Sequence, residues 1–135
     1  MKKFLLIMCM LTSMIANAQT IYIMGGKDHS VFLGLFNASP YDSRSIWNAY
    51  GSYGSKYNSD CIWNKYGTYG SKYNSYCPWN KYSSEVPILV DKEGNNYGYF
   101  NESNKNEIVR RVCKAAESIM DGDLPLSEWY DLLFK

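Results

Sequence analysis

A sixteen-residue unit occurs three times in succession in this chain, at residues 39–54, 55–70 and 71–86. Neighbouring units share ten of their sixteen positions. Because equal sequences adopt equal local structures, each short unit is expected to pack its apolar groups against the next. Six positions are identical in all three units: Ser39/Ser55/Ser71, Tyr41/Tyr57/Tyr73, Ser43/Ser59/Ser75, Trp47/Trp63/Trp79, Asn48/Asn64/Asn80 and Tyr50/Tyr66/Tyr82.

The repeat is aromatic and almost free of aliphatic side chains. It holds nine of the thirteen tyrosines and three of the four tryptophans, and Ile46 and Ile62 are its only isoleucines or leucines. An aromatic side chain buries roughly 150–250 Å² and keeps a polar tip. The units must therefore pack through their rings.

Two local structures fit the unit. Residues 45–51 resemble a capped single helical turn, which would place Trp47 and Tyr50 on one side. The competing pattern is a strand-like alternation that would make each unit a rung of a short β-solenoid, with these residues pointing one way: Tyr41, Ser43, Ser45 and Trp47. Glycines that follow tyrosines, where they can adopt positive φ, and the prolines of units 1 and 3 favour turns.

The segments on either side of the repeat predict two β-hairpins. Apolar runs at 20–24 and 31–36 are separated by a Gly-rich polar loop. A second pair of runs, at 87–90 and 97–100, flanks a turn in which Gly94 and Asn95 are expected to adopt positive φ.

The C-terminal part predicts one main helix and a short last one. Asn104 and Glu107 have a capping-box spacing, and Gly122 supplies the stop. Ser127 is expected to cap the last helix. The fold class expected is α+β: a small antiparallel sheet of two hairpins, one main C-terminal helix covering one face, and the aromatic Gly-rich tandem repeat inserted between the hairpins.

Residues 1–18 have the pattern of a signal peptide. Lys2 and Lys3 precede an apolar run at 4–11, and residues 16–18 read Ala-Asn-Ala, a small-x-small cleavage site. The run is shorter than the roughly 20 residues that span a bilayer. We therefore expect export to the periplasm or the medium, no transmembrane anchor after cleavage, and a single small domain at 19–135.

Charge and cysteine content narrow the function. Residues 19–135 carry twelve Lys and Arg against thirteen Asp and Glu, without a basic cluster, which argues against nucleic acid as a partner. Cys61 and Cys77 occupy one slot in successive units. They are either a disulfide pair or occupants of a small-residue slot, since unit 1 has Ser45 there.

Cys113 falls on the apolar face of the main helix, which predicts a buried, unreactive thiol.

The composition of the repeat predicts a non-enzymatic binding or structural protein of the cell envelope. Trp47, Trp63 and Trp79 are candidate platforms for a glycan or a protein partner, with Asn48, Asn64 and Asn80 as polar partners and Tyr50, Tyr66 and Tyr82 beside them. The alternative is that the same rings only form the core, in which case the protein would be a small hydrolase or a thiol enzyme using His29, the only histidine. No cofactor motif or metal-binding spacing occurs, so neither a cofactor nor a metal is expected.

The repeat also resembles tandem units of the form Asn-x-Tyr-Gly-x-Tyr-Gly-Ser-x-Tyr in uncharacterised exported bacterial proteins. There the units are likewise followed by an apolar Pro-Ile-Leu-Val strand and a turn like Asp91-Lys92-Glu93-Gly94-Asn95. The resemblance covers residues 31–100 and is specific over 39–82. It implies export, but no activity, substrate or catalytic residue.

Overall fold

The computed structural model describes residues 19–135, so the predicted signal peptide lies outside the described residues. Its elements are β1 (Tyr22–Gly25), β2 (Val31–Leu35), β3 (Ile88–Val90), β4 (Asn96–Tyr99), α2 (Glu107–Asp121) and α3 (Leu126–Phe134). The strands form one antiparallel sheet in the order β2-β1-β3-β4. The prediction of an α+β fold with two hairpins and a longer C-terminal helix is confirmed.

The sheet is stabilised by the alternating burial of side chains in its central strand β1 and by hydrogen bonds in its turns. Ile23 of β1 is fully buried and pairs with Leu89 of β3. In the β3–β4 turn Gly94 has a φ of 87°, as expected, whereas Asn95 has no positive φ. The side chain of Asn95 instead donates to the carboxylate of Asp91 at 2.9 Å, as does the Tyr97 hydroxyl. These hydrogen bonds lower the pKa of Asp91.

Both helices begin at other residues than the sequence predicts. Asn106 caps α2, and its side-chain oxygen accepts from the amides of Ile108 and Val109. Asn104 is buried, its side-chain nitrogen donates to carbonyls of β4 and its side-chain oxygen accepts from the amide of Asn106, so it serves the segment before the helix. Gly122 ends α2 with a φ of 77°, as predicted. Helix α3 follows Pro125 and has no side-chain cap, so the predicted cap at Ser127 is wrong.

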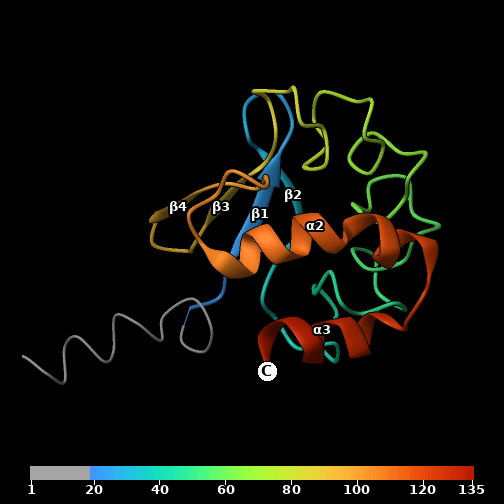
Figure 1. Cartoon of the computed structure of the whole chain (residues 1–135). Helices are drawn as coiled ribbons and strands as arrows, with labels where there is room; N and C mark the ends of the chain where they lie inside the picture. Colours follow the sequence, from blue (N-terminus) through green and yellow to red (C-terminus); the bar gives the residue numbers. More distant parts are fainter. Residues whose placement is uncertain (1–18) are drawn as a thin grey trace, which may run out of the picture.

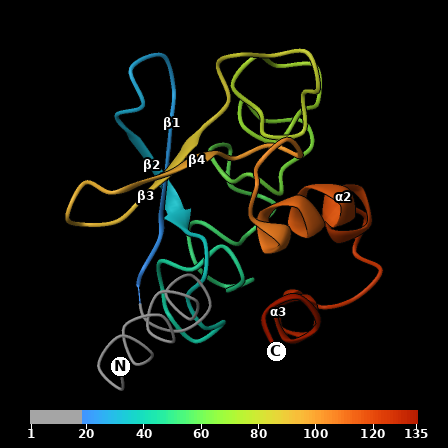
Figure 2. The same ribbon diagram turned by 60° about the vertical axis from the view of Figure 1, so that its left-hand side comes forward.

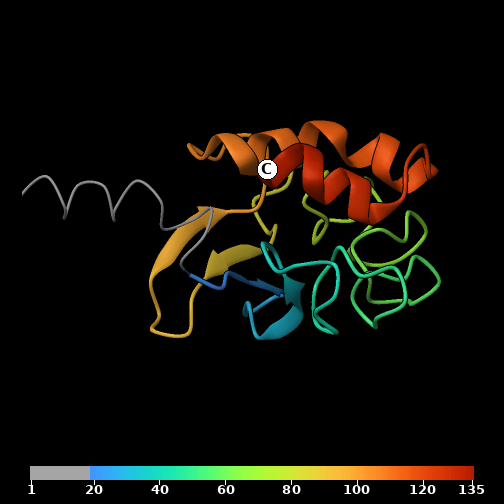
Figure 3. The same cartoon turned by 90° about the horizontal axis from the view of Figure 1, so that it is seen from below.

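The molecule has two layers. Helices α2 and α3 lie side by side in one layer, and the sheet and the segment 39–86 together form the other (Figure 3). A single hydrophobic core between the layers contains residues from the sheet, the repeat and both helices. None of the helices in residues 19–135 combines the length and the hydropathy needed to cross a bilayer.

The segment 39–86 is a continuous series of β-turns that winds beside the sheet (Figures 1 and 2). In unit 2 the carbonyls of Ser55, Asn58, Cys61 and Asn64 each accept from the amide three residues later, at 2.9–3.1 Å. Among residues 39–86 only Ser45 takes part in a β-bridge, a parallel one to Leu35. The preference for turns is therefore confirmed, but the expected helical turn at residues 45–51 is a pair of β-turns, and the solenoid rung is absent.

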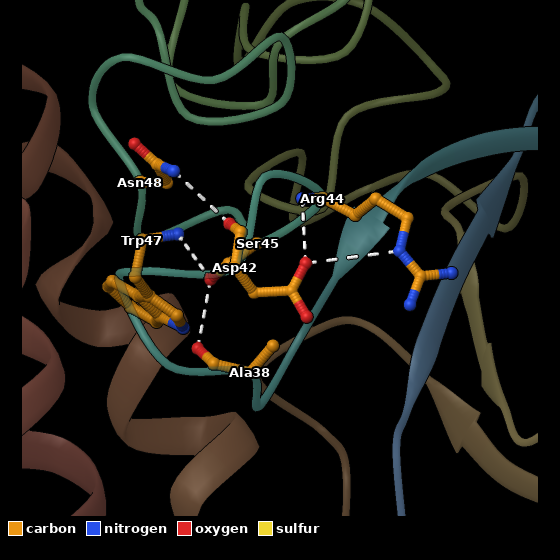
Figure 4. A network of polar contacts seen from close by, with 6 residues as sticks. All are labelled: Ala38, Asp42, Arg44, Ser45, Trp47 and Asn48. Carbon is orange, nitrogen blue, oxygen red and sulfur yellow. Dashed lines mark hydrogen bonds and ion pairs between the residues drawn. The ribbon is translucent and has the colours of Figure 1, made fainter.

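Most of these turns are closed a second time by a side chain at their first position, and the exceptions begin at Gly51 and Gly67. In unit 1 the carboxylate of Asp42 accepts the amide of Arg44 at 2.9 Å (Figure 4). The Ser45 hydroxyl accepts the amide of Trp47 at 3.0 Å and donates to the Ala38 carbonyl at 2.9 Å. Short oxygen-bearing side chains favour such turns because they mimic a backbone carbonyl. A small or polar residue at every third position thus specifies the path of the chain.

The glycines that end units 1 and 2 allow a close contact of the backbone with itself. A Cβ atom on Gly54 would lie 1.9 Å from the Asn48 carbonyl oxygen, and one on Gly70 would lie 2.0 Å from that of Asn64. Neither glycine has a positive φ. The predicted role of positive φ in the repeat glycines is therefore wrong, and these two are needed for space.

Candidate functional site

The three tryptophans of the repeat form an aromatic column inside the molecule. The ring centroids of Trp47 and Trp63 are 5.3 Å apart, and those of Trp63 and Trp79 are 5.5 Å apart. Each indole N–H donates to a backbone carbonyl of the preceding chain, as in the 2.6 Å bond from Trp63 to Ile46. We call Trp47, Trp63 and Trp79 the tryptophan column.

The column is mostly inaccessible to a ligand. Trp47 and Trp63 are only 1% and 2% exposed, and Trp79 is partly buried. The first two predicted platforms therefore lie in the core, because a segment with few aliphatic residues can form a core only from its rings. Only Trp79 retains a surface that a ligand can reach.

The three asparagines are also occupied within their own units. The side-chain oxygen of Asn64 accepts the amide of Tyr66 at 3.0 Å, and its nitrogen donates to the Asn58 carbonyl at 3.2 Å. Asn48 and Asn80 make the same two bonds. The structure thus assigns these amides to turn closure, a role that the sequence analysis did not anticipate.

Six tyrosines point outward. They are 84–100% exposed and occupy two slots of each unit: Tyr41, Tyr57 and Tyr73 in one, and Tyr50, Tyr66 and Tyr82 in the other. We call these six the outer tyrosines. Tyr50 is fully exposed although Trp47 is buried, so the prediction that these two share a side is wrong. Tyr53, Tyr69 and Tyr76 of the same units pack against the core.

A groove of about 920 Å³ separates units 2 and 3 from α2. We call it the repeat groove. On the repeat side it is lined by the accessible part of Trp79, by two outer tyrosines and by three lysines: Tyr66, Tyr73, Lys65, Lys72 and Lys81. Lys114 and Glu117 of α2, Asp121 at its end and Glu102 before it supply charges on the other side. The groove therefore offers aromatic rings together with charges of both signs.

The cysteines of the repeat are free thiols, so the bridge considered between Cys61 and Cys77 is not formed. Each sulfur occupies the place of the Ser45 hydroxyl: the amides of Trp63 and Trp79 donate to Cys61 and Cys77 at 3.4 Å. The thiols are thus directed into their own turns, in agreement with the small-residue alternative. Burial raises the pKa of Cys61 to about 11 and that of Cys77 to about 12.

His29 belongs to the β1–β2 turn and serves the sheet. It has a φ of 53°, and its Nε2 atom lies 3.1 Å from the Val86 carbonyl oxygen. Cys113 is partly buried on α2, and burial is the main cause of its raised pKa. A thiol with a raised pKa is a poor nucleophile at neutral pH. Nothing in this geometry pairs His29 with an activated nucleophile.

Within residues 19–135 no group of three or more His, Cys, Asp or Glu side chains is placed to hold a metal ion. No family model matches the chain, and searches of curated proteins and of solved structures found no match either. The surface itself must therefore carry the functional argument.

Proposed function

We propose that this protein is an exported, non-enzymatic binding protein of the cell envelope. The outer tyrosines and the repeat groove would form its interaction surface, and an envelope glycan or an envelope protein would be its partner. The observation that carries the proposal is the near-complete exposure of six tyrosines at two slots of the repeat.

A comparison of slots within the repeat supports this reading. Two other exposed slots vary from unit to unit: Ser52, Thr68 and Ser84 occupy one, and Ala49, Lys65 and Lys81 another, whereas a third holds serine throughout, at Ser43, Ser59 and Ser75. The two slots of the outer tyrosines hold tyrosine in every unit. A fully exposed ring adds little to the core, because stabilisation by burial follows the area removed from water. We infer that these rings contact a binding partner.

The arrangement also suits weak, repeated contacts. Tyrosine combines an apolar ring with a polar tip and loses little conformational entropy on binding. Three units on one rigid backbone present equivalent rings, so that a polymeric partner can engage several at once and gain avidity. The rigidity comes from the doubly closed turns, which fix the backbone under each ring.

The test is co-sedimentation of the purified protein with envelope fractions. The test variant changes Tyr50, Tyr66 and Tyr82 to Ser, and the matched control changes Ser52, Thr68 and Ser84 to Ala. Both sets lie at exposed slots, so circular dichroism and thermal unfolding should match the wild type in both. We expect saturable pelleting of the wild type and the control, and loss of pelleting in the tyrosine variant. Equal pelleting of both variants, or no pelleting of the wild type, would refute the proposal.

A further inference from the structure

Units 2 and 3 carry a second pattern superimposed on the outer tyrosines. Each of their four outer tyrosines directly follows a lysine: Lys56–Tyr57, Lys65–Tyr66, Lys72–Tyr73 and Lys81–Tyr82. In unit 1 the corresponding residues are Pro40 before Tyr41 and Ala49 before Tyr50. The Nζ atoms of Lys56, Lys65 and Lys72 lie 5.8, 5.7 and 5.5 Å from the centroids of the adjoining rings. These three pairs each present an ammonium group and an aromatic ring together.

These lysines form few ion pairs. All four are exposed, and within residues 19–135 their single ion pair is that of Lys65 with Asp121 at 3.5 Å. Units 2 and 3 contain only Asp60 and Glu85 as acidic residues. The four pairs thus give units 2 and 3 an excess of positive charge beside exposed rings, on a chain whose residues 19–135 carry twelve Lys and Arg against thirteen Asp and Glu.

We propose that the Lys–Tyr pairs of units 2 and 3 bind an acidic polysaccharide, one whose sugar residues carry carboxylates. This inference rests on the proposed function and specifies its ligand. A uronic acid residue offers a carboxylate to the lysine and an apolar C–H face to the tyrosine ring, so that one sugar satisfies one pair. Each contact is weak at an exposed site, and four on one backbone act together.

The charges around the repeat groove determine where such a chain lies. Lys65, Lys72 and Lys81 line its repeat side. On the side of α2 three carboxylates outnumber the single cation, Lys114: Glu102, Glu117 and Asp121. An acidic chain is attracted to the first side and repelled by the second. It therefore follows the units along their outer edge, within reach of Tyr66 and Tyr73, and does not bridge to α2.

Single-stranded nucleic acid has the same two chemical features, acidic groups and flat faces. The near-neutral charge of the whole chain favours the polysaccharide, because nucleic acid binding relies on extensive phosphate neutralisation. Nucleic acid is therefore the competing outcome of the test.

The test is isothermal titration of the purified protein with polygalacturonate and with the same polymer after methyl esterification of its carboxylates. The test variant changes Lys56, Lys65, Lys72 and Lys81 to Gln. The matched control changes four exposed lysines outside the repeat to Gln: Lys27, Lys92, Lys105 and Lys135. Circular dichroism checks that both variants fold, and the esterified polymer tests the wild type without any substitution.

We expect polygalacturonate to bind the wild type and the control with equal affinity. Its affinity should fall by about tenfold or more for the test variant, and the affinity of the wild type should fall similarly on esterification of the polymer and at high salt. Equal binding of the esterified polymer, or equal losses in the two lysine variants, would overturn the inference. Tighter binding of an oligodeoxythymidylate would replace polysaccharide by nucleic acid. If polygalacturonate fails to bind while envelope fractions still pellet the protein through its tyrosines, the ligand inference is refuted and the proposed function stands.

Discussion

The indole of Trp79 is stacked on that of Trp63, with ring centroids 5.5 Å apart and ring planes inclined by 9°. At one end of the tryptophan column, the ring of Trp79 packs against that of Phe100, which follows β4, with ring centroids 5.4 Å apart. At the other end Trp47 contacts Phe134 of α3 at 5.8 Å. The tryptophan column therefore connects the three units to the end of the sheet and to the helix layer. The outer tyrosines take no part in this packing.

The tryptophan column predicts that the same substitution, Trp to Ala, lowers the free energy of unfolding by different amounts at Trp63 and Trp79. Trp63→Ala removes a buried ring with an indole neighbour on each side and leaves the Ile46 carbonyl without its donor, so we expect a loss of about 3–5 kcal/mol in the free energy of unfolding. Trp79→Ala should cost clearly less because Trp79 is only partly buried. Denaturant titration measures both. Tyr66→Ala, at an 87% exposed ring, is the control and should change stability by about 0.5 kcal/mol at most. Equal losses at Trp63 and Trp79 would contradict the column as described.

The close contact at the end of unit 2 predicts an intolerance of any side chain at Gly70. Its Cβ would meet the backbone oxygen of Asn64 at 2.0 Å, which no rotamer change can relieve. Gly70→Ala should therefore destabilise the protein by about 1–3 kcal/mol or more, through displaced backbone. Thr68→Ala, two residues away and exposed, is the control. Thermal unfolding compares the two, and a wild-type melting temperature for Gly70→Ala would show that the units do not close in this way.

The hairpins and the main helix could be predicted because their patterns have the familiar periods. Ile23 and its neighbours in β1 alternate with period 2, and the buried positions of α2 follow the helical period. The helix start was missed because Asn104 and Asn106 are both plausible caps, and only the packing of β4 decides that Asn104 serves the strand. Local sequence does not contain that tertiary contact.

The sequence favoured turns in the repeat, but their regular succession was missed because only the helical and the strand periods were considered. The signal is a period of three: Ser55, Asn58, Cys61 and Asn64 are all small or amide residues that begin a turn. It could have identified the turn series. It could not have identified the outward rings, since buried Trp47 and exposed Tyr50 both stand two residues after a turn start. The winding of a whole unit decides which ring points inward.

Each repeat asparagine both accepts and donates a hydrogen bond through its side chain, which predicts that substitutions at Asn64 lower the free energy of unfolding by different amounts. Asn64→Ala removes both the acceptor for the Tyr66 amide and the donor to the Asn58 carbonyl, and should cost about 1–2 kcal/mol. Asn64→Asp retains the acceptor and loses the donor, so its cost should be smaller. The same order is expected at Asn48, which makes the equivalent bonds. Denaturant titration of the variants tests this, and an aspartate variant as unstable as the alanine variant would remove turn closure as the explanation.

The buried thiols predict that stability falls at alkaline pH. Burial raises the pKa of Cys61 from 9.0 to about 11 and that of Cys77 from 9.0 to about 12, while the unfolded chain releases these protons near pH 9. The folded state therefore holds more protons between these values. The contribution of each thiol is fully present below about pH 9 and decreases above it by about 1.4 kcal/mol per pH unit, until the folded thiol itself ionises.

The variant that tests this pH dependence is suggested by the repeat itself. Unit 1 has Ser45 in the slot of these cysteines, and its hydroxyl closes the same turn. Cys61→Ser combined with Cys77→Ser should therefore fold and should lose less stability than the wild type between pH 8 and pH 10.5. Denaturant titrations under reducing conditions across that range give the two slopes. The remaining slope of the variant comes from Cys113, Tyr69 and Tyr97, whose pKa values burial also raises. Identical slopes for the two proteins would mean that Cys61 and Cys77 are not buried in their turns.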